Sequence, residues 1–228
     1  MARTRSPVLP KPSRLPLHLL LTLALLFALL SSSARAQCEG RWVNSAAQIP
    51  PGLVGSINDM LRLPNGDIIV AGLFTDLGGR AMSNLARWNG REWSPFAGGT
   101  NGRVNKLLAL PNGDLVAAGE FTMAGNTPAN YIARWNGSEW SPFHTGTSAP
   151  VLAMVLTPNG DLVIGGNFAS ASGVLVYRIA RWNGATWEPV SPGATNGSIY
   201  ALAIMPNGDL IVAGSMSLIG NSLITRIA

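Results

Sequence analysis

Short apolar runs separated by turn sequences recur along the chain from residue 57 onward. The run at 104–110 (VNKLLAL) leads into the turn Pro111-Asn112-Gly113, and a second run at 115–119 (LVAAG) follows it. In such a turn Pro presets φ, and Gly takes the left-handed conformation that closes a hairpin. Because the second run is apolar at every position, we expect both faces of that strand to be buried.

This pattern is an internal repeat. The string PNGD begins at residues 64, 111, 158 and 206, with spacings of 47, 47 and 48, and ARWNG begins at 86, 133 and 180. Each unit predicts four short strands, of which the third ends in Arg-Trp and the fourth begins with another Trp. Four strands per unit with buried sheet faces predict an all-β fold, a β-propeller of four-stranded blades. A β-solenoid is the alternative, although its repeats are usually shorter, and the WD40 signatures are absent.

The residues also carry a family resemblance. LPNGDLVAAGEFTMAG at 110–125, followed by YIARWNGSEWSPF at 131–143, resembles the delta-sixty type repeats of bacterial secreted propellers, which are themselves similar to kelch repeats. The resemblance extends over residues 57–228. It implies a secreted propeller, but it implies no particular activity, since propellers share one architecture across unrelated functions.

The phase of the repeat predicts the blade boundaries. Complete units occupy 57–103, 104–150 and 151–198, and an incomplete fourth unit occupies 199–228. About three and a half blades form either an open arc or a fragment of a larger ring, because propellers usually have about four to eight blades. The alternative is a four-bladed ring in which residues 40–43, within a partial strand segment at 37–56, supply the missing outer strand.

The first 36 residues predict a secretory signal peptide. Basic residues precede an apolar run at 15–30, and Ala34 and Ala36 provide a small-residue cleavage site before Gln37. The run has 16 residues, fewer than the ~20 that span a bilayer, so an uncleaved anchor is the less favoured reading. We therefore expect a secreted or cell-surface protein, periplasmic or extracellular, with no membrane span after signal removal.

The composition and net charge of the chain indicate which classes of binding partner are disfavoured. The chain is 47% apolar, only 12% charged, and rich in Gly and Pro, which favours a folded chain with many turns. Five of the 16 basic residues lie within 1–36, which leaves 11 basic against 11 acidic residues. A neutral mature chain gives no electrostatic argument for nucleic acid or for an anionic membrane. Cys38 is the sole cysteine, so it is either a free thiol or pairs outside the chain.

The sequence contains few residues that could bind a metal ion or take part in catalysis. An aspartate follows each turn glycine, and a role in the hairpin is favoured over calcium binding because no companion acids have calcium-loop spacing. His144 is the only histidine beyond the signal peptide, which disfavours both a metal site and a Ser-His-Asp triad. Glu120 has no paired carboxylate in its repeat column for glycosidase chemistry. We therefore expect no catalytic, cofactor or metal residues. The four aspartates are Asp67, Asp114, Asp161 and Asp209.

Repeated aromatic and basic residues are interpreted as packing. The Trp pairs favour contacts between blades over glycan stacking, and Arg87, Arg134 and Arg181 are expected to stack on aromatic rings. The loops between second and third strands vary, which suits recognition; they span 75–84, 122–131, 169–178 and 217–226. The predicted function is a noncatalytic binding module for an unidentified protein or glycan. The alternative is a fragment of an extracellular carbohydrate-active enzyme whose catalytic groups lie elsewhere.

Overall fold

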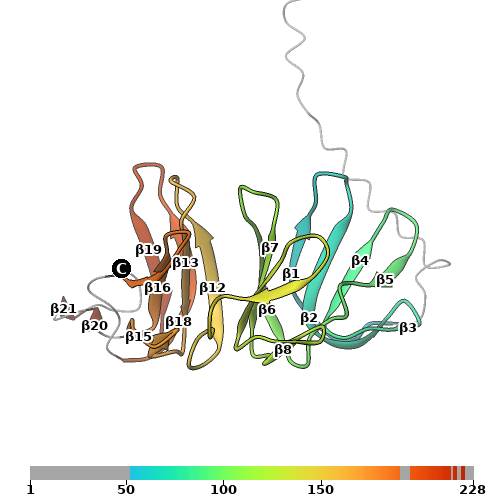
Figure 1. Ribbon diagram of the computed structural model, residues 1–228, viewed down its shortest axis with the longest axis horizontal. Coiled ribbons are helices and arrows are strands. Elements are labelled where there is room, and N and C mark those ends of the chain that lie inside the picture. Colours follow the sequence, from blue (N-terminus) through green and yellow to red (C-terminus); the bar gives the residue numbers. More distant parts are fainter. Residues whose placement is uncertain (1–51, 191–195, 217, 220–221, 224–228) are drawn as a thin grey trace, which may run out of the picture. The chain divides into compact units, whose positions relative to one another are not determined.

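The computed structural model describes residues 52–190, 196–216, 218–219 and 222–223. Every regular element among them is a β-strand, and the strands form antiparallel sheets that follow one another in chain order (Figure 1). No helix long and apolar enough to cross a membrane occurs in this part of the chain. The expected signal peptide, its cleavage site at Ala36 and Gln37, Cys38 and the strand at 40–43 lie outside the described residues.

Each sheet takes its strands in the order in which they occur along the chain. The first sheet has the order β1 (Val54–Arg62), β2 (Ile68–Leu77), β4 (Leu85–Trp88), β5 (Trp93–Pro95), with β3 (Arg80–Ala81) paired to β2. The second sheet has four strands, β6 (Val104–Ala109), β7 (Leu115–Gly119), β10 (Ile132–Trp135) and β11 (Trp140–Pro142). The third sheet also has four, β12 (Val151–Leu156), β13 (Leu162–Gly166), β16 (Ile179–Trp182) and β17 (Trp187–Pro189). The fourth pairs β18 (Ile199–Ile204) with β19 (Leu210–Gly214).

The sheets pack face to face. One buried cluster joins Ile69 and Leu85 of the first sheet to Val104 and Phe121 of the second unit. All five residues of β7 and all five of β13 are buried, as their continuous apolarity predicts. The fold is therefore an all-β propeller built of blade-like sheets.

The turn between the first two strands of each sheet has the predicted geometry. Gly113 has φ +90°, and its N–H donates to the Leu110 carbonyl at 2.9 Å, while Leu110 N–H donates to the Asp114 carbonyl at 2.8 Å. The corresponding glycines Gly66, Gly160 and Gly208 also have φ near +90°. The left-handed conformation explains why Gly recurs there.

A β-bulge interrupts the first strand of each sheet, and it requires a second glycine. In β6 the pairing register shifts between Val104 and Lys106, which leaves Asn105 as the extra residue. Opposite the bulge, a Cβ on Gly119 would lie 2.1 Å from the Arg103 carbonyl oxygen. The same close approach occurs at Gly72, Gly166 and Gly214. Bulges redirect side chains, and here the bulge turns Asn105 toward the next sheet, where its Nδ2 donates to the Val151 carbonyl at 2.9 Å.

The variable segments contain more regular structure than the sequence indicated. We expected loops, but small hairpins form within them: β8 (Met123–Ala124) with β9 (Thr127–Pro128), β14 (Ser170–Ala171) with β15 (Val174–Leu175), and β20 (Leu218–Ile219) with β21 (Ser222–Leu223). Isolated bridges join Thr100 to Ala124 and Thr147 to Ala171. The hairpins are thus held against the segment that links each sheet to the previous one.

Candidate functional site

Three of the four repeated aspartates, Asp67, Asp114 and Asp209, bond to the asparagine of their own turn, whereas in the fourth turn the Asp161 N–H donates to Thr157 Oγ1 at 3.1 Å. Asn112 Nδ2 donates to Asp114 Oδ2 at 2.8 Å, and Asp114 N–H donates back to Asn112 Oδ1 at 3.1 Å. The turns at 65–67 and 207–209 repeat this pair of bonds. No group of three or more His, Cys, Asp or Glu side chains that could hold a metal ion occurs in the described part of the chain. The geometry supports the structural reading of these aspartates.

The repeated arginines have a different role from the one the sequence suggested. We expected them to stack on aromatic rings; each lies instead against the turn aspartate of its own sheet. Arg87 Nε and Nη2 contact Asp67 Oδ2 at 2.7 and 2.5 Å, whereas Arg134 Nε lies 3.5 Å from Asp114. Arg181 Nη1 lies 3.7 Å from Asp161. The PNGD and ARWNG strings therefore recur together because their charged residues form an ion pair between the second and third strands.

Arg181 contacts a second carboxylate in addition to that of Asp161. Its Nη2 contacts Glu188 Oε2 at 2.6 Å, and Asn183 Nδ2 donates to Glu188 Oε1 at 2.6 Å. These hydrogen bonds hold the pKa of Glu188 below its ordinary value of 4.5, and Glu188 in turn raises the pKa of Arg181. Serine stands at the Glu188 position in the first two units, so this link belongs to the third sheet.

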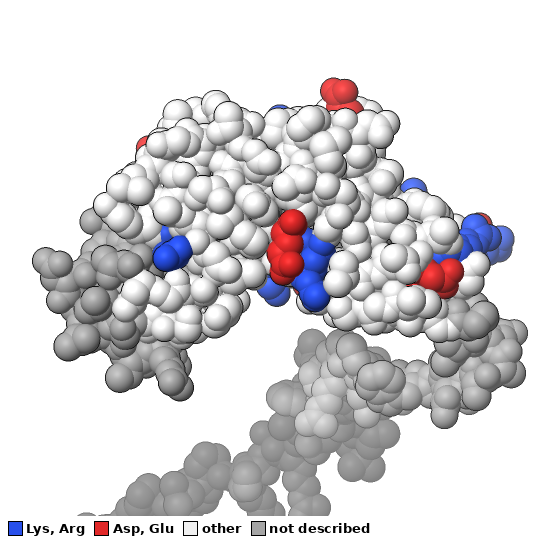
Figure 2. Space-filling view, turned by 90° about the horizontal axis from the view of Figure 1, so that it is seen from below, with Lys and Arg blue, Asp and Glu red and all other residues white. Residues whose placement is uncertain are grey.

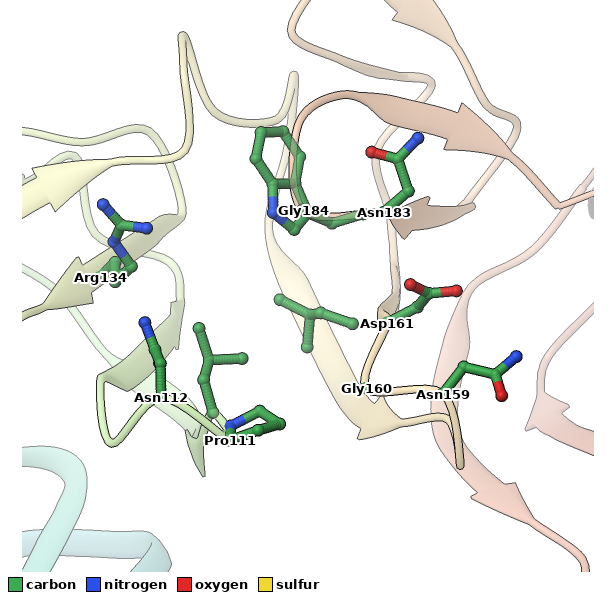
Figure 3. Close-up of a pocket in the computed structure, with 11 residues that line it drawn as sticks. Pro111, Asn112, Arg134, Asn159, Gly160, Asp161, Asn183 and Gly184 are labelled. Atoms are coloured by element: carbon green, nitrogen blue, oxygen red, sulfur yellow. The ribbon is translucent and has the colours of Figure 1, made fainter.

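A pocket of about 310 Å³ opens between the second and third sheets, at the end that carries the turns. Arg134 and Asn112 stand on one side, and the backbone at Gly160 and Gly184 forms the other (Figure 3). The side chain of Asp161 points away from Arg134 in this view. The lining residues are Leu110, Pro111, Asn112, Arg134, Asn159, Gly160, Asp161, Leu162, Trp182, Asn183 and Gly184.

Trp182 contributes an aromatic ring to the pocket. The ring is half-buried and packs edge-on against Phe143, which follows the second sheet, with centroids 5.4 Å apart. It also lies 5.3 Å from the Trp187 ring and 5.2 Å from the His144 ring. These contacts support the packing interpretation of the Trp pairs, and they fix the orientation of the Trp182 ring.

Arg134 is the least engaged of the three repeated arginines. The 3.5 Å contact of its guanidinium group with Asp114 is the sole polar contact of its side chain in the described structure, although all three arginine side chains are about equally exposed. Arg87 has two short contacts, and Arg181 contacts two carboxylates. The remaining guanidinium N–H groups of Arg134 are thus available to a ligand in the pocket. The sequence did not reveal this difference, because all three arginines lie in the same ARWNG string.

The other singled-out residues lie at the surface. His144 is exposed, and its Nε2 is 3.1 Å from the Ala185 carbonyl oxygen. Glu120 forms an ion pair with Arg103 at 3.6 Å. Seen from the end opposite the turns, charged side chains are few, and an acidic group and a basic group touch near the middle (Figure 2).

A second pocket, of about 250 Å³, lies beside the β14–β15 hairpin. Its hydroxyl groups are engaged with the backbone: Ser148 Oγ accepts from Ala169 and Ser170 N–H at 3.0 and 3.1 Å, and Ser172 Oγ donates to the Phe143 carbonyl at 3.2 Å. These groups hold the hairpin in place, which leaves the first pocket as the stronger candidate.

A match to a family of known description agrees with the propeller fold. Residues 110–137 match a family described as "Domain of unknown function (DUF5122) beta-propeller". No curated protein matches the sequence. Similar solved structures include the WD40 β-propeller domain of Doa1, with 18% identity, a TM-score of 0.48, and coverage of 71% of this chain and 48% of that chain.

Two further structures are similar. YCF48 bound to D1 peptide has 24% identity and a TM-score of 0.44, with 73% of this chain and 50% of that chain covered. PorZ, a surface component of the type-IX secretion system of Porphyromonas gingivalis, has 12% identity and a TM-score of 0.44, with 75% and 27% covered. The chain thus spans half or less of the length of each of these proteins.

Proposed function

We propose that the chain is an exported, noncatalytic β-propeller of the delta-sixty or kelch-like type that acts as an extracellular or cell-surface binding module. Export rests on the basic, apolar and small-residue segments of 1–36. The binding role rests on the pocket between the second and third sheets. The lining of this pocket is mainly polar with a smaller apolar part, and a concave site in which polar groups converge can bind a ligand.

Arg134 is the observation that carries the binding role. It is the one arginine of the repeat that lines the described pocket with only a long contact to its aspartate. Leu110 and Trp182, which are partly exposed, supply apolar surface beside it. A ligand with an apolar face and a hydrogen-bond acceptor, such as a glycan or a peptide, fits this combination of groups.

The test compares Arg134→Gln with Arg87→Gln, a matched control at the same repeat position outside the pocket. Tryptophan fluorescence is recorded during titration with panels of neutral oligosaccharides and of peptides, because Trp182 lines the pocket. We expect a ligand from one panel to change the fluorescence, and Arg134→Gln to weaken binding about tenfold, which corresponds to ~1.4 kcal/mol. Arg87→Gln should leave the affinity unchanged.

Two results would contradict this function. Equal loss of affinity in both variants would show that the arginines act through stability alone. Hydrolysis of an oligosaccharide by the purified protein would favour the carbohydrate-active enzyme over a binding module.

A further inference from the structure

Asparagine precedes glycine in two kinds of turn that recur along the chain. The first kind contains the PNGD string and joins the first two strands of a sheet, whereas the second follows Arg-Trp and joins the last two strands. Because glycine has no side chain to shield its amide, the glycine nitrogen of an Asn-Gly pair can attack the carbonyl carbon of the asparagine side chain. The reacting pair is the same in both kinds of turn, but its hydrogen bonds differ.

In the PNGD turns both reacting nitrogens are bonded elsewhere. The nitrogen that would attack is that of Gly113, whose N–H donates to the Leu110 carbonyl at 2.9 Å. The nitrogen that would leave is Asn112 Nδ2, which donates to Asp114 Oδ2 at 2.8 Å. Reaction therefore requires both bonds to break. The turns at 65–67 and 207–209 repeat both bonds.

In the turn between the last two strands of the second sheet, the same two nitrogens are free. Neither the N–H of Gly137 nor Nδ2 of Asn136 has a hydrogen-bond partner among the described residues, and both residues are exposed. Asn136 Oδ1, in contrast, accepts from the N–H groups of Ser138 and Glu139, both at 2.9 Å. These donors face the oxygen on which negative charge develops during attack, as in an oxyanion hole. The turn at 89–92 in the first sheet has the same arrangement.

We propose that Asn136 and Asn89 are sites of self-modification, at which the amide is converted to a carboxylate through a cyclic imide. At Asn136, the Gly137 nitrogen gives its proton to water and forms a bond to Cγ. The Cγ–Nδ2 bond breaks, and Nδ2 takes up a proton and leaves as ammonia. Water then opens the imide: addition at Cγ yields aspartate, and addition at the main-chain carbonyl carbon yields isoaspartate, whose backbone runs through Cγ. Water is the only co-reactant.

Asn183, in the equivalent turn of the third sheet, has one restraint that Asn136 lacks. Its Oδ1 accepts from the N–H groups of Ala185 and Thr186, both at 2.9 Å, and the Gly184 N–H has no partner among the described residues. Its Nδ2, however, donates to Glu188 Oε1 at 2.6 Å, which holds the leaving nitrogen. We expect Asn183 to react about tenfold more slowly than Asn136, since one more hydrogen bond must break. The modification does not depend on ligand binding.

The experiment incubates the exported protein at mildly alkaline pH, once folded and once in urea. Peptide mass spectrometry quantifies the exchange of amide for carboxylate at each asparagine. In the folded protein we expect Asn136 and Asn89 to react first, then Asn183, and Asn112 more than tenfold more slowly than Asn136. In urea the four rates should become similar, because the hydrogen bonds of the fold are lost.

Two reciprocal variants test the role of the leaving nitrogen. Serine stands at the Glu188 position in the first two units, so Glu188→Ser should accelerate reaction at Asn183, and Ser141→Glu should slow it at Asn136. Asn89, in the first sheet, is the internal control, since its rate should be the same in both variants if they are folded.

Three outcomes would overturn the proposal. Asn112 could react as fast as Asn136 in the folded protein, which would show that the hydrogen bonds of the turns do not control the reaction. Asn136 could stay intact when folded and react only in urea, which would show that the turn protects it. Unchanged rates at Asn183 in Glu188→Ser and at Asn136 in Ser141→Glu would show that the leaving nitrogen is not restrained by the carboxylate.

Discussion

The indole N–H of Trp140 donates a 2.8 Å hydrogen bond to the carbonyl oxygen of Ala97 in the previous unit. Trp187 is its counterpart in the third sheet, yet its Nε1 is buried without a hydrogen-bond partner in the described structure. The residue beside the ring explains the difference. A Cβ on Gly125 would lie 3.2 Å from both Ala97 O and Trp140 Cδ1, and Ser172, the counterpart of Gly125, has that Cβ. We infer that Ser172 occupies the space in which the hydrogen bond forms in the second unit.

Gly125→Ser should therefore destabilise the protein by about 2 kcal/mol. The buried Trp140 N–H loses its acceptor, at a cost of about 1 kcal/mol, and serine at φ +53° adds strain of similar size. Urea titration monitored by tryptophan fluorescence measures the change. A stability equal to that of the unaltered chain would show that the ring and the carbonyl adjust without losing their bond.

Ser172→Gly should act in the opposite direction and stabilise the protein by about 1 kcal/mol. Ser172 has φ +46°, which glycine adopts without strain, and the smaller residue lets Trp187 Nε1 approach the preceding backbone. The gain is smaller than the loss at Gly125, because the variant loses the 3.2 Å bond from Ser172 Oγ to the Phe143 carbonyl and the 3.3 Å bond that Thr145 N–H donates to Ser172 Oγ. The same urea titration tests it, and destabilisation by this variant would contradict the steric explanation.

The two kinds of repeated glycine should respond differently to alanine. At Gly113 a Cβ meets nothing within 4 Å, so Gly113→Ala introduces only the strain of φ +90°, about 1 kcal/mol. At Gly119 a Cβ would lie 2.1 Å from the Arg103 carbonyl oxygen and 2.9 Å from Val104 Cα, which forces the bulge open. We expect Gly119→Ala to be several-fold more destabilising in thermal unfolding. Equal effects would contradict the close approach at the bulge.

The ion pairs between the turn aspartates and the strand arginines differ in length. Replacing the aspartates should therefore lower the stability of the protein by different amounts. Asp67 is nearly buried and contacts Arg87 at 2.5 and 2.7 Å, whereas Asp114 lies 3.5 Å from Arg134. Asp67→Asn should cost about 1 kcal/mol more than Asp114→Asn, a modest difference because both arginines are about half exposed. Denaturant titration in low and high salt checks this, since screening should reduce the difference. A larger loss for Asp114→Asn would be the opposite of what the distances imply.

The sequence predicted the propeller because its signals are local. Pro111-Asn112-Gly113 specifies a turn, and the apolar run 115–119 specifies a strand with two buried faces, whatever lies elsewhere. Repetition of these signals then fixes the order of strands in each sheet.

The site was not predictable in the same way, because it depends on distances between residues that the repeat makes equivalent. Arg87 and Arg134 share one sequence string, and only the positions of their aspartates show that Arg134 is the more available of the two. The bulge at Asn105 likewise depends on pairing between two strands, which no single segment encodes. The arginines were expected to stack on aromatic rings, and the contacts that the structure shows for their side chains are ion pairs with the turn aspartates, which depend on the pairing of the second and third strands.

The last prediction concerns export of the protein and involves residues outside the described structure. The exported protein should begin at Gln37, because Ala34 and Ala36 provide the small residues that signal peptidase sites require. Ala36→Arg should block cleavage and leave residues 15–30 attached, whereas Ser31→Ala, which exchanges one small residue for another, should leave processing unchanged. Intact-mass analysis of the three proteins distinguishes these products. A mature chain that retains 15–30 without any substitution would instead indicate a membrane anchor, since an apolar run then stays on the protein.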